Sequence, residues 1–466
     1  MSRRAVLAAA VAAAAILGGC TGSTPAPTTT ASPVPNRSRA PVAPILRGSG
    51  AVDLGLKWNT FLTAPLSYAQ QLGWGETFTE VEWCAVRDLA PGRQFGPTDR
   101  ALQQARGFGF GLMIKLRVGD CTGAAEVQDP AEGLNKHPST YPDDPGRYRA
   151  FIDTMVRRYQ PQGVRAWAIE NEVDAANFWS GTGQQYADTA KLVADAVRAA
   201  DPKAIILDAG ISSTGYGVAM SGDLLEAGRP EEALALYRAY YARRHGGGGA
   251  RFGPAASVDD LRRILADQPA VAAREMVAAN WEVVNSGAVS AYQLHFYEDP
   301  RNLPTLLQYI DNHLKAAISI EAWEVGVAWP GAAYTEAGHA DDLARLVATL
   351  LTRRISPIVY LPLAFTPRAG KEEIFRGLVS PQGQVLAPGR VWARFAAAAK
   401  TSTDVVALTG SIDGSAAVGA LVVGPGGSLA AAWTSTGPVR LLDLPGGREA
   451  AVRGLAEQRG VRLSPN

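Results

Sequence analysis

Excess charge of either sign, cysteine, histidine and long apolar runs are all scarce in this 466-residue sequence. Lys and Arg number 45 and Asp and Glu number 44, so the formal net charge is +1. Without a basic excess to neutralise phosphates, we expect no nucleic-acid partner. The longest apolar run, Ala5–Leu17, is shorter than the roughly 20 residues that cross a bilayer. No spacing among the 5 histidines and 3 cysteines is typical of a zinc site, so we expect neither a metal nor a cofactor.

What the sequence does contain is apolar material for a large core. Hydrophobic residues make up 47% of the chain. Glycine and proline total 49 + 30 = 79 residues, which is below the level of low-complexity chains. A fibrous or largely disordered protein is therefore excluded. The length suits either about three average domains or one large α/β barrel with additions.

The first 20 residues have the pattern of an export signal. Arg3 and Arg4 precede the apolar run, and small residues follow it. Leu17-Gly18-Gly19-Cys20 resembles the bacterial lipobox, which implies that Cys20 is lipidated and becomes the mature N-terminus. The alternative is a plain secretory signal with a coincidental cysteine. Arg3-Arg4 also resembles a twin-arginine signal, although the usual phenylalanine is missing.

Residues 21–46 are rich in Thr, Ser, Pro and Ala, and we expect them to form a disordered linker. The protein would then lie in the bacterial cell envelope, lipid-anchored on the outer side of the cytoplasmic membrane, or be secreted. The membrane contact would be this N-terminal lipid anchor only. In such an oxidising compartment, Cys84 and Cys121 are expected to form a disulfide, with two separate buried thiols as the alternative.

Short apolar runs alternate with amphipathic stretches from residue 51 onward. They predict eight strands, near 52–58, 77–84, 111–118, 165–172, 203–209, 289–297, 317–325 and 356–365. Helical patterns lie between them, for example Arg147–Tyr159 and Tyr186–Ala200. Eight strands alternating with helices predict a (β/α)8 TIM barrel over residues 47–400. A doubly wound open sheet is the alternative, but no G-x-G-x-x-G follows an early strand.

Two segments do not fit the strand–helix alternation. Residues 210–288 are too long for a loop and carry helical patterns at 230–244 and 258–285, which predict a helical insertion. This insertion either walls the site or is only decorative. Residues 401–466 contain short alternating runs separated by Gly and Pro, which predict a small antiparallel β-module.

Carboxylates stand at the ends of two apolar strands on opposite sides of the predicted barrel. Glu172 closes the fourth strand and Glu324 closes the seventh. Active sites of such barrels lie at the carboxyl ends of the strands, so these two side chains should converge there. Burying a carboxylate is costly, and two facing carboxylates are what glycoside hydrolysis requires. Glu321 is the rival to Glu324, but it lies three residues earlier, inside the strand.

The sequence around these carboxylates is similar to that of a known enzyme clan. Trp167, Ile169 and Asn171-Glu172 resemble the W-x-I-x-N-E motif of glycoside hydrolase clan A, near families 5, 39 and 42. That resemblance implies retaining glycosidases on (β/α)8 barrels. It implies an acid/base role for Glu172, a nucleophile role for Glu324 and a contact of Asn171 with the substrate 2-hydroxyl. It further implies that Tyr297 hydrogen-bonds the nucleophile and that His295 lies beside it.

The remaining candidate residues are expected to bind substrate. The arginine common on strand two of the clan is absent, and Arg117 on strand three is the expected substitute. Tryptophans near strand ends suit the apolar faces of sugar rings, and the candidates are Trp58, Trp83 and Trp323. Glu170 replaces a common aromatic residue and is expected to support the site. Strand eight ends in Phe365 where a tryptophan is common.

The sequence therefore predicts a retaining glycoside hydrolase that cleaves O-glycosidic bonds of oligo- or polysaccharides. We expect a monomer with a carbohydrate substrate. Two alternatives remain open: a non-catalytic carbohydrate-binding lipoprotein on the same barrel, and a barrel enzyme of another class such as an isomerase or lyase. The second would need a metal or phosphate site, and none is recognisable in the sequence.

Overall fold

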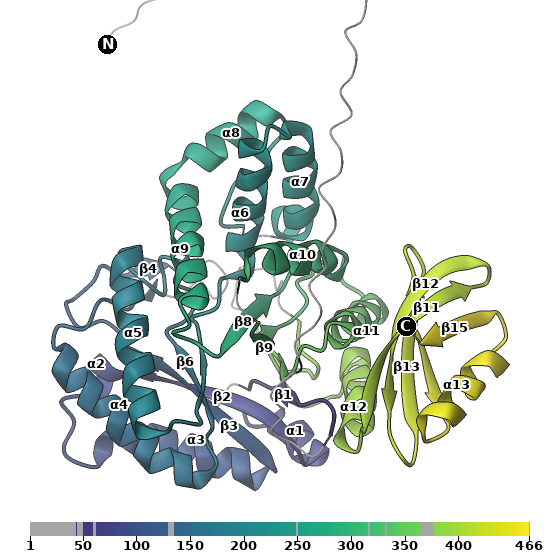
Figure 1. The fold of residues 1–466 in the computed structure, drawn as a ribbon, viewed down its shortest axis with the longest axis horizontal. Helices are drawn as coiled ribbons and strands as arrows, with labels where there is room; N and C mark the ends of the chain where they lie inside the picture. Colours follow the sequence, from purple (N-terminus) through teal and green to yellow (C-terminus); the bar gives the residue numbers. More distant parts are fainter. Residues whose placement is uncertain are drawn as a thin grey trace, which may run out of the picture. The chain divides into compact units, whose positions relative to one another are not determined.

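A closed parallel barrel forms the body of the protein. The computed structural model describes residues 43, 50–58, 62–128, 135–247, 250–315, 317–330, 333–365 and 376–465. The predicted signal, including Cys20, lies outside these ranges. So does the predicted linker, residues 21–46, apart from residue 43. The barrel order is β1-β10-β9-β8-β7-β6-β3-β2 (Figure 1). Its strands are Leu54–Leu56 (β1), Gly75–Glu82 (β2), Phe110–Arg117 (β3), Ala166–Ile169 (β6), Ile205–Leu207 (β7), Ala291–Phe296 (β8), Ser319–Val325 (β9) and Ile358–Tyr360 (β10).

The helices around the barrel follow the predicted alternation. They are Leu66–Leu72 (α1), Gly96–Gly107 (α3), Pro145–Tyr159 (α4), Gly183–Ala200 (α5), Leu303–His313 (α10), Glu336–Thr352 (α11) and Ala387–Lys400 (α12). Local chemistry sets their ends. Asp144 accepts a bond from the backbone N–H of Arg147 at the start of α4, and Thr182 and Gln185 form a capping box on α5. The predicted TIM barrel is thus confirmed and the open sheet is excluded.

Short elements lie in the connections between the barrel's strands and helices. They are the helical turns Trp83–Val86 (α2), Arg93–Phe95 (η1), Gln160–Gln162 (η2) and Pro300–Asn302 (η3), and the small hairpin Val127–Gln128 (β4) with Asn135–Lys136 (β5). Among the described residues, none of the helices combines the length and the apolar character needed to span a membrane.

The described residues between β7 and β8 form four helices. They are Ser213–Glu226 (α6), Pro230–Gly247 (α7), Val258–Ala266 (α8) and Gln268–Asn285 (α9), and Figure 1 shows them grouped on one side of the barrel. The single helix predicted at 258–285 is divided at Asp267, because Pro269 can occupy the first turn of a helix but not its interior. Helix α6 was not expected: its residues are buried on most sides, so it lacks the amphipathic pattern.

The C-terminal residues form a separate antiparallel sheet. Its order is β14-β13-β12-β11-β15, from the strands Asp404–Ile412 (β11), Ser415–Val423 (β12), Ser428–Thr434 (β13), Arg440–Leu444 (β14) and Val461–Pro465 (β15). Helix α13 (Arg448–Glu457) precedes the last strand, and neither of these two was predicted. The sheet packs on barrel helices: Arg345 of α11 donates to the carbonyl of Gly437 at 2.8 Å, and Arg394 of α12 pairs with Asp443 at 2.8 Å.

Candidate active site

A cavity opens where the carboxyl ends of the barrel strands meet. Its volume is about 570 Å³, within the range of small-ligand sites. Its lining includes most of the predicted site residues, namely Trp58, Arg117, Asn171, Glu172, Tyr297 and Glu324. The insertion contributes Arg244 of α7 and Arg251, which follows that helix. The insertion therefore forms part of the cavity wall.

Glu324 at the end of β9 is held as a carboxylate by two donors. The hydroxyl of Tyr297 donates to Oε2 at 2.9 Å, and the ammonium of Lys115 on β3 donates to Oε1. Burial alone raises the pKa of Glu324, but the charge of Lys115 and the other partners outweigh burial and lower the pKa to about 2. This side chain is therefore ionised at any physiological pH.

Glu172 at the end of β6 has the opposite electrostatic setting. Burial raises its pKa, and the hydrogen bond from His295 only partly offsets that rise. The Nδ1 atom of His295 lies 3.0 Å from Glu172 Oε1, and Nε2 lies 3.1 Å from the side-chain oxygen of Gln293. A Cβ atom at Gly210 would come within 2.7 Å of His295 Nε2, so glycine is required for the ring to take this place.

The two carboxylates face one another at short range. One oxygen of Glu172, one ring nitrogen of His295 and one oxygen of Glu324 all lie within 4.8 Å of one another. Carboxyl groups of retaining glycosidases lie roughly 5–5.5 Å apart, whereas inverting enzymes need about 6.5–9.5 Å. Such a cluster also resembles a metal-binding trio. The ammonium of Lys115 already neutralises Glu324, however, and it would repel a cation at this point.

The backbone that presents Glu172 is strained. Glu170 and Glu172 have φ values of +66° and +41°, in the left-handed region that side chains with a Cβ rarely adopt. Strain of this kind is concentrated at functional sites. Between them, Asn171 accepts a hydrogen bond from Lys115 on its side-chain oxygen. Its amide nitrogen has no protein acceptor among the described residues, and Asn171 is one of the residues that line the cavity.

Arg117 lines the cavity, but its guanidinium is occupied by carboxylates of the protein. Its guanidinium donates to Glu82 at 2.6 Å and to Glu80 at 3.3 Å, and its Nε lies 3.7 Å from Glu170. It does not contact Glu324. The cation that does contact Glu324 is Lys115, two residues earlier on the same strand and facing the same way. Arg117 borders the cavity but is only 4% exposed.

Glu170 lies behind the cavity. It is fully buried, and its Oε1 accepts a bond from the backbone N–H of Val118 at 2.6 Å. Burial raises its pKa to about 7, although Arg117 opposes the rise. Together these contacts fix the strand end that carries Glu172, as expected of a supporting residue.

Only one of the three predicted tryptophans reaches the cavity. Trp58 lines it and donates to Gln104 at 2.9 Å. Trp83 is 1% exposed and packs on Tyr148, and Trp323 is fully buried inside the barrel, where it stacks on Phe78. Neither can bind a sugar. The prediction was wrong because closeness to a strand end in sequence does not determine which way a side chain points.

The rival carboxylate Glu321 also points elsewhere. It is fully buried and accepts a hydrogen bond from the indole of Trp323 at 2.7 Å. It is absent from the cavity lining, whereas Glu324 is present there. Of the two carboxylates on β9, only Glu324 is therefore positioned to meet a ligand.

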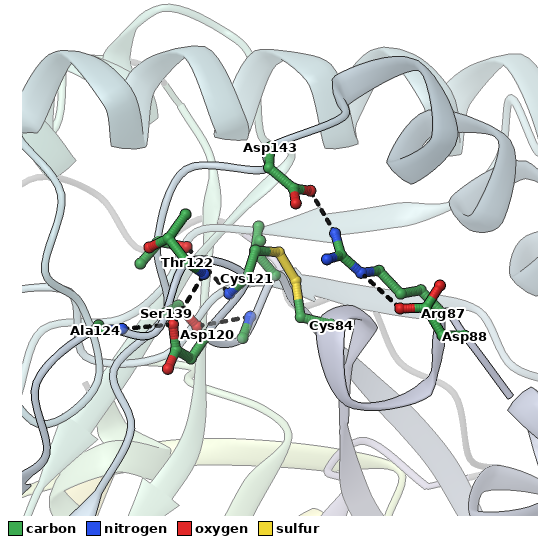
Figure 2. Close-up of a disulfide and its surroundings, with 12 residues drawn as sticks. Cys84, Arg87, Asp88, Asp120, Cys121, Thr122, Ala124, Ser139 and Asp143 are labelled. Carbon is green, nitrogen blue, oxygen red and sulfur yellow. Dashed lines mark hydrogen bonds and ion pairs between the residues drawn. A yellow bond between two sulfur atoms is a disulfide. The ribbon is translucent and has the colours of Figure 1, made fainter.

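The predicted disulfide joins two segments of the rim. Cys84 and Cys121 are bonded with their Cα atoms 5.2 Å apart, as Figure 2 shows. In the same view Asp120 accepts from the backbone N–H groups of Thr122 and Ala124, which shapes the loop after β3. Ser139, on the returning part of this loop, accepts bonds from Gly119 at 3.1 Å and from Arg117 at 3.3 Å. The disulfide therefore braces a loop that contacts the cavity wall.

Several charged residues at the site were not predicted from the sequence, among them Lys57 and Glu80, which line the cavity, and the buried Lys115, which bonds Glu324. Lys57 follows β1, Glu80 lies on β2 and Lys115 on β3. The available signal was a lysine inside the apolar run Met113–Leu116, because strand alternation points Lys115 to the same side as Arg117. Without a known partner for it, an internal lysine gives no indication of its role.

Comparison with known proteins finds similar folds but no similar sequence family. No family model matches the chain, and no curated protein matches it. A family 39 glycoside hydrolase from Bacteroides cellulosilyticus WH2 aligns with a TM-score of 0.50 at 13% identity, covering 84% of this chain and 72% of that one. A glucosidase from Croceicoccus marinus gives 0.48 at 13%, covering 85% and 78%. A monomeric beta-xylosidase from Caulobacter crescentus CB15 gives 0.46 at 14%, covering 83% and 75%. The family 39 structure confirms the resemblance to clan A barrels at the level of the fold.

Proposed function

We propose that this protein is a retaining glycoside hydrolase in which Glu324 is the nucleophile and Glu172 the general acid and base. The observation that carries the proposal is a pair of facing carboxylates whose pKa values are shifted in opposite directions. Pairs of titratable groups separated in this way mark acid and base assignments. An oxygen of each carboxylate lies within 4.8 Å of the other, and this short spacing supports a double displacement.

The proposed reaction has two steps. In the first, a carboxylate oxygen of Glu324 bonds to the anomeric carbon while Glu172 gives its proton to the departing glycosidic oxygen. In the second, water attacks the anomeric carbon, Glu172 takes the water's proton, and the ester bond to Glu324 breaks. The ester carries no negative charge, so the repulsion that helps to raise the pKa of Glu172 is absent in the intermediate. That change suits Glu172 to act as the base.

The neighbouring residues have supporting parts in this proposal. Tyr297 and Lys115 keep Glu324 ionised and oriented through both of its oxygens. His295 orients the acid through Nδ1. Because Lys115 occupies the side-chain oxygen of Asn171, the amide nitrogen is turned to donate to the sugar's 2-hydroxyl.

A panel of 4-nitrophenyl glycosides tests the proposal directly. We expect hydrolysis of at least one, with the first-formed product retaining the anomeric configuration in proton NMR. Glu324→Ala should remove nearly all turnover, and azide should restore part of it as a glycosyl azide. Glu321→Gln is the matched control and should stay active.

Three results would contradict the proposal in different ways. A folded protein that binds oligosaccharides but hydrolyses none of the panel would be a carbohydrate-binding protein. An inverted first product would exclude double displacement. Loss of activity in Glu321→Gln, with no azide rescue of Glu324→Ala, would transfer the nucleophile role to Glu321.

We further propose that the protein is exported and lipid-anchored through Cys20, so that it acts on carbohydrate outside the cytoplasm. The lipobox-like sequence supports this. The Cys84–Cys121 disulfide supports it as well, since such bonds persist in oxidising compartments.

A further inference from the structure

Beside the two catalytic candidates, a second charged group borders the same cavity. It consists of Lys57 after β1 and Glu80 on β2, and both side chains line the cavity. Glu80 lies in register with Lys115 of β3, one layer above the apolar pair Phe78 and Met113. Barrel interiors are normally filled by bulky apolar residues, so charges in this layer need another reason.

The ammonium of Lys57 is only partly satisfied by the protein. It donates to the carbonyl of Phe78 at 2.6 Å and lies 4.4 Å from the centre of the Phe78 ring. An ammonium has three donors. Within the described part of the chain, no second acceptor is bound to it. The remaining N–H donors of Lys57 are therefore available to a ligand, since this side chain lines the cavity.

Glu80 is partly satisfied in the same way. Its Oε2 lies 3.3 Å from Arg117, and 30% of its side chain is exposed. Burial raises its pKa, but Arg117, Lys115 and Lys57 together lower it, so the carboxylate is ionised. Lys57 and Glu80 influence each other electrostatically, yet among the described residues they form no ion pair with one another. If Lys57 and Glu80 served stability alone, we would expect them to contact each other directly, because an ion pair satisfies both charges.

We propose that Lys57 and Glu80 form a binding site for two neighbouring hydroxyl groups of the sugar ring that lies over Glu324. Adjacent ring hydroxyls offer both donors and acceptors: one hydroxyl donates to Glu80 while its neighbour accepts from Lys57. Lys57, Glu80 and Glu324 line the same cavity. Lys57 and Lys115, the lysine bonded to Glu324, lie 4.4 and 4.6 Å from the centre of the same Phe78 ring, which places the site beside the proposed nucleophile. This inference rests on the proposed function. It adds that the substrate's two hydroxyls beside Lys57 and Glu80 are unsubstituted.

The test pairs protein variants with deoxygenated substrates. The probe is the 4-nitrophenyl glycoside that the wild type hydrolyses fastest, together with its 3-deoxy, 4-deoxy and 6-deoxy analogues. Hydrogen bonds to charged groups contribute about 1.5–3 kcal/mol, so removing a contacted hydroxyl should lower wild-type kcat/KM about 10- to 150-fold. Lys57→Met and Glu80→Gln should lower kcat/KM for the parent substrate by a similar factor. With the analogue that lacks the contacted hydroxyl, the variants should have a kcat/KM less than about threefold below that of the wild type on the same analogue. The two losses are then not additive, as expected when the side chain and the hydroxyl make one shared contact.

If the loss of kcat/KM caused by each variant multiplies the loss caused by each of the three deoxygenations, neither residue contacts any of these hydroxyls. That result would overturn the inference and leave the proposed glycosidase function intact. A wild type that hydrolyses no glycoside would instead overturn the proposed function, and this inference with it. Lys191→Met, which changes an exposed lysine on α5, is the matched control and should behave as the wild type. Circular dichroism and Tm verify that the variants fold, and Glu80→Gln carries the test alone if Lys57→Met does not fold.

Discussion

Lys115 is the side chain on which the charge of Glu324 most depends. It has no exposed surface, and it bridges the carboxylate of Glu324 and the side-chain oxygen of Asn171. A buried cation this close to a carboxylate stabilises the ionised form. One lysine thus links the state of the proposed nucleophile to the orientation of the residue proposed to bind the substrate.

Replacing Lys115 by methionine should move the acid limb of the pH–rate profile. Glu324 acts only when deprotonated, and its pKa in the wild type is about 2, so the acid limb should lie at low pH. Without Lys115, burial would raise that pKa toward or above its ordinary value. We expect the acid limb of kcat/KM to shift upward by at least about one pH unit and the maximum to fall about 100-fold. An unchanged limb in Lys115→Met would show that Lys115 does not set the charge of Glu324.

Glu170 provides a test that needs no substrate. Its pKa in the folded protein is about 7, above its ordinary value of 4.5. The folded state therefore retains a proton that the unfolded state loses between these two values. Protonated Glu170 therefore contributes to the free energy of unfolding below pH 4.5. This contribution is lost as the pH rises through 7, which lowers the free energy of unfolding by up to about 3 kcal/mol.

Glu170→Gln should remove that loss, because glutamine does not titrate. We expect the free energy of unfolding, measured with urea at pH 5 and pH 7.5, to fall less in the variant than in the wild type. Glu282→Gln, on the exposed side of α9, is the control and should keep the wild-type difference. Identical pH dependence in Glu170→Gln and the wild type would contradict the raised pKa.

At the scale of elements, the rim of the barrel is held by cross-connections between loops and strands. The backbone N–H of Cys84 donates to the carbonyl of Val118 at 2.9 Å, directly beside the disulfide. From there Ser139 and Arg117 continue the contacts to the cavity wall. The loop after β3 is thereby fixed covalently at one end and by hydrogen bonds at the other.

Removing the disulfide should lower both stability and substrate binding. The bond spans 37 residues of sequence, and the chain-entropy model assigns a loop of this size about 3–4 kcal/mol. We expect Cys84→Ser/Cys121→Ser to lose about 2–4 kcal/mol in urea denaturation and to raise KM several-fold. Maleimide labelling of the denatured, non-reduced protein lacking Cys20 should find no free thiol. Equal stability of the double variant and the wild type would argue against a structural role for the bond.

At the scale of the whole molecule, attachment and chemistry are predicted to reside in different parts of the chain. The proposed anchor is Cys20, whereas every residue proposed for catalysis lies between Lys57 and Glu324. Cys20→Ser should therefore move the protein from the membrane fraction to the soluble fraction without changing kcat/KM. Membrane attachment that persists in this variant after a carbonate wash would mean that the anchor lies elsewhere.

The pattern of residues along the chain was enough to predict the barrel, the two carboxylates and the cysteine pair. Apolar runs of strand length alternating with amphipathic helices specify a parallel barrel, and the carboxyl ends of its strands must meet at one mouth. Glu172 and Glu324 end such strands, and Cys84 and Cys121 follow neighbouring ones, so their approach follows from topology alone.

Which side chains lie beside the two carboxylates is known only from the folded barrel. Lys57, Glu80 and Lys115 come from three strands, and nothing local to any of them indicates the other two. Trp83 and Trp323 lie near strand ends in the sequence just as Trp58 does, yet packing turns both into the core. Contacts between strands depend on how barrel closure brings distant segments into register. A linear sequence records the alternation of each strand but not that register, and the register determines which charges lie next to each other.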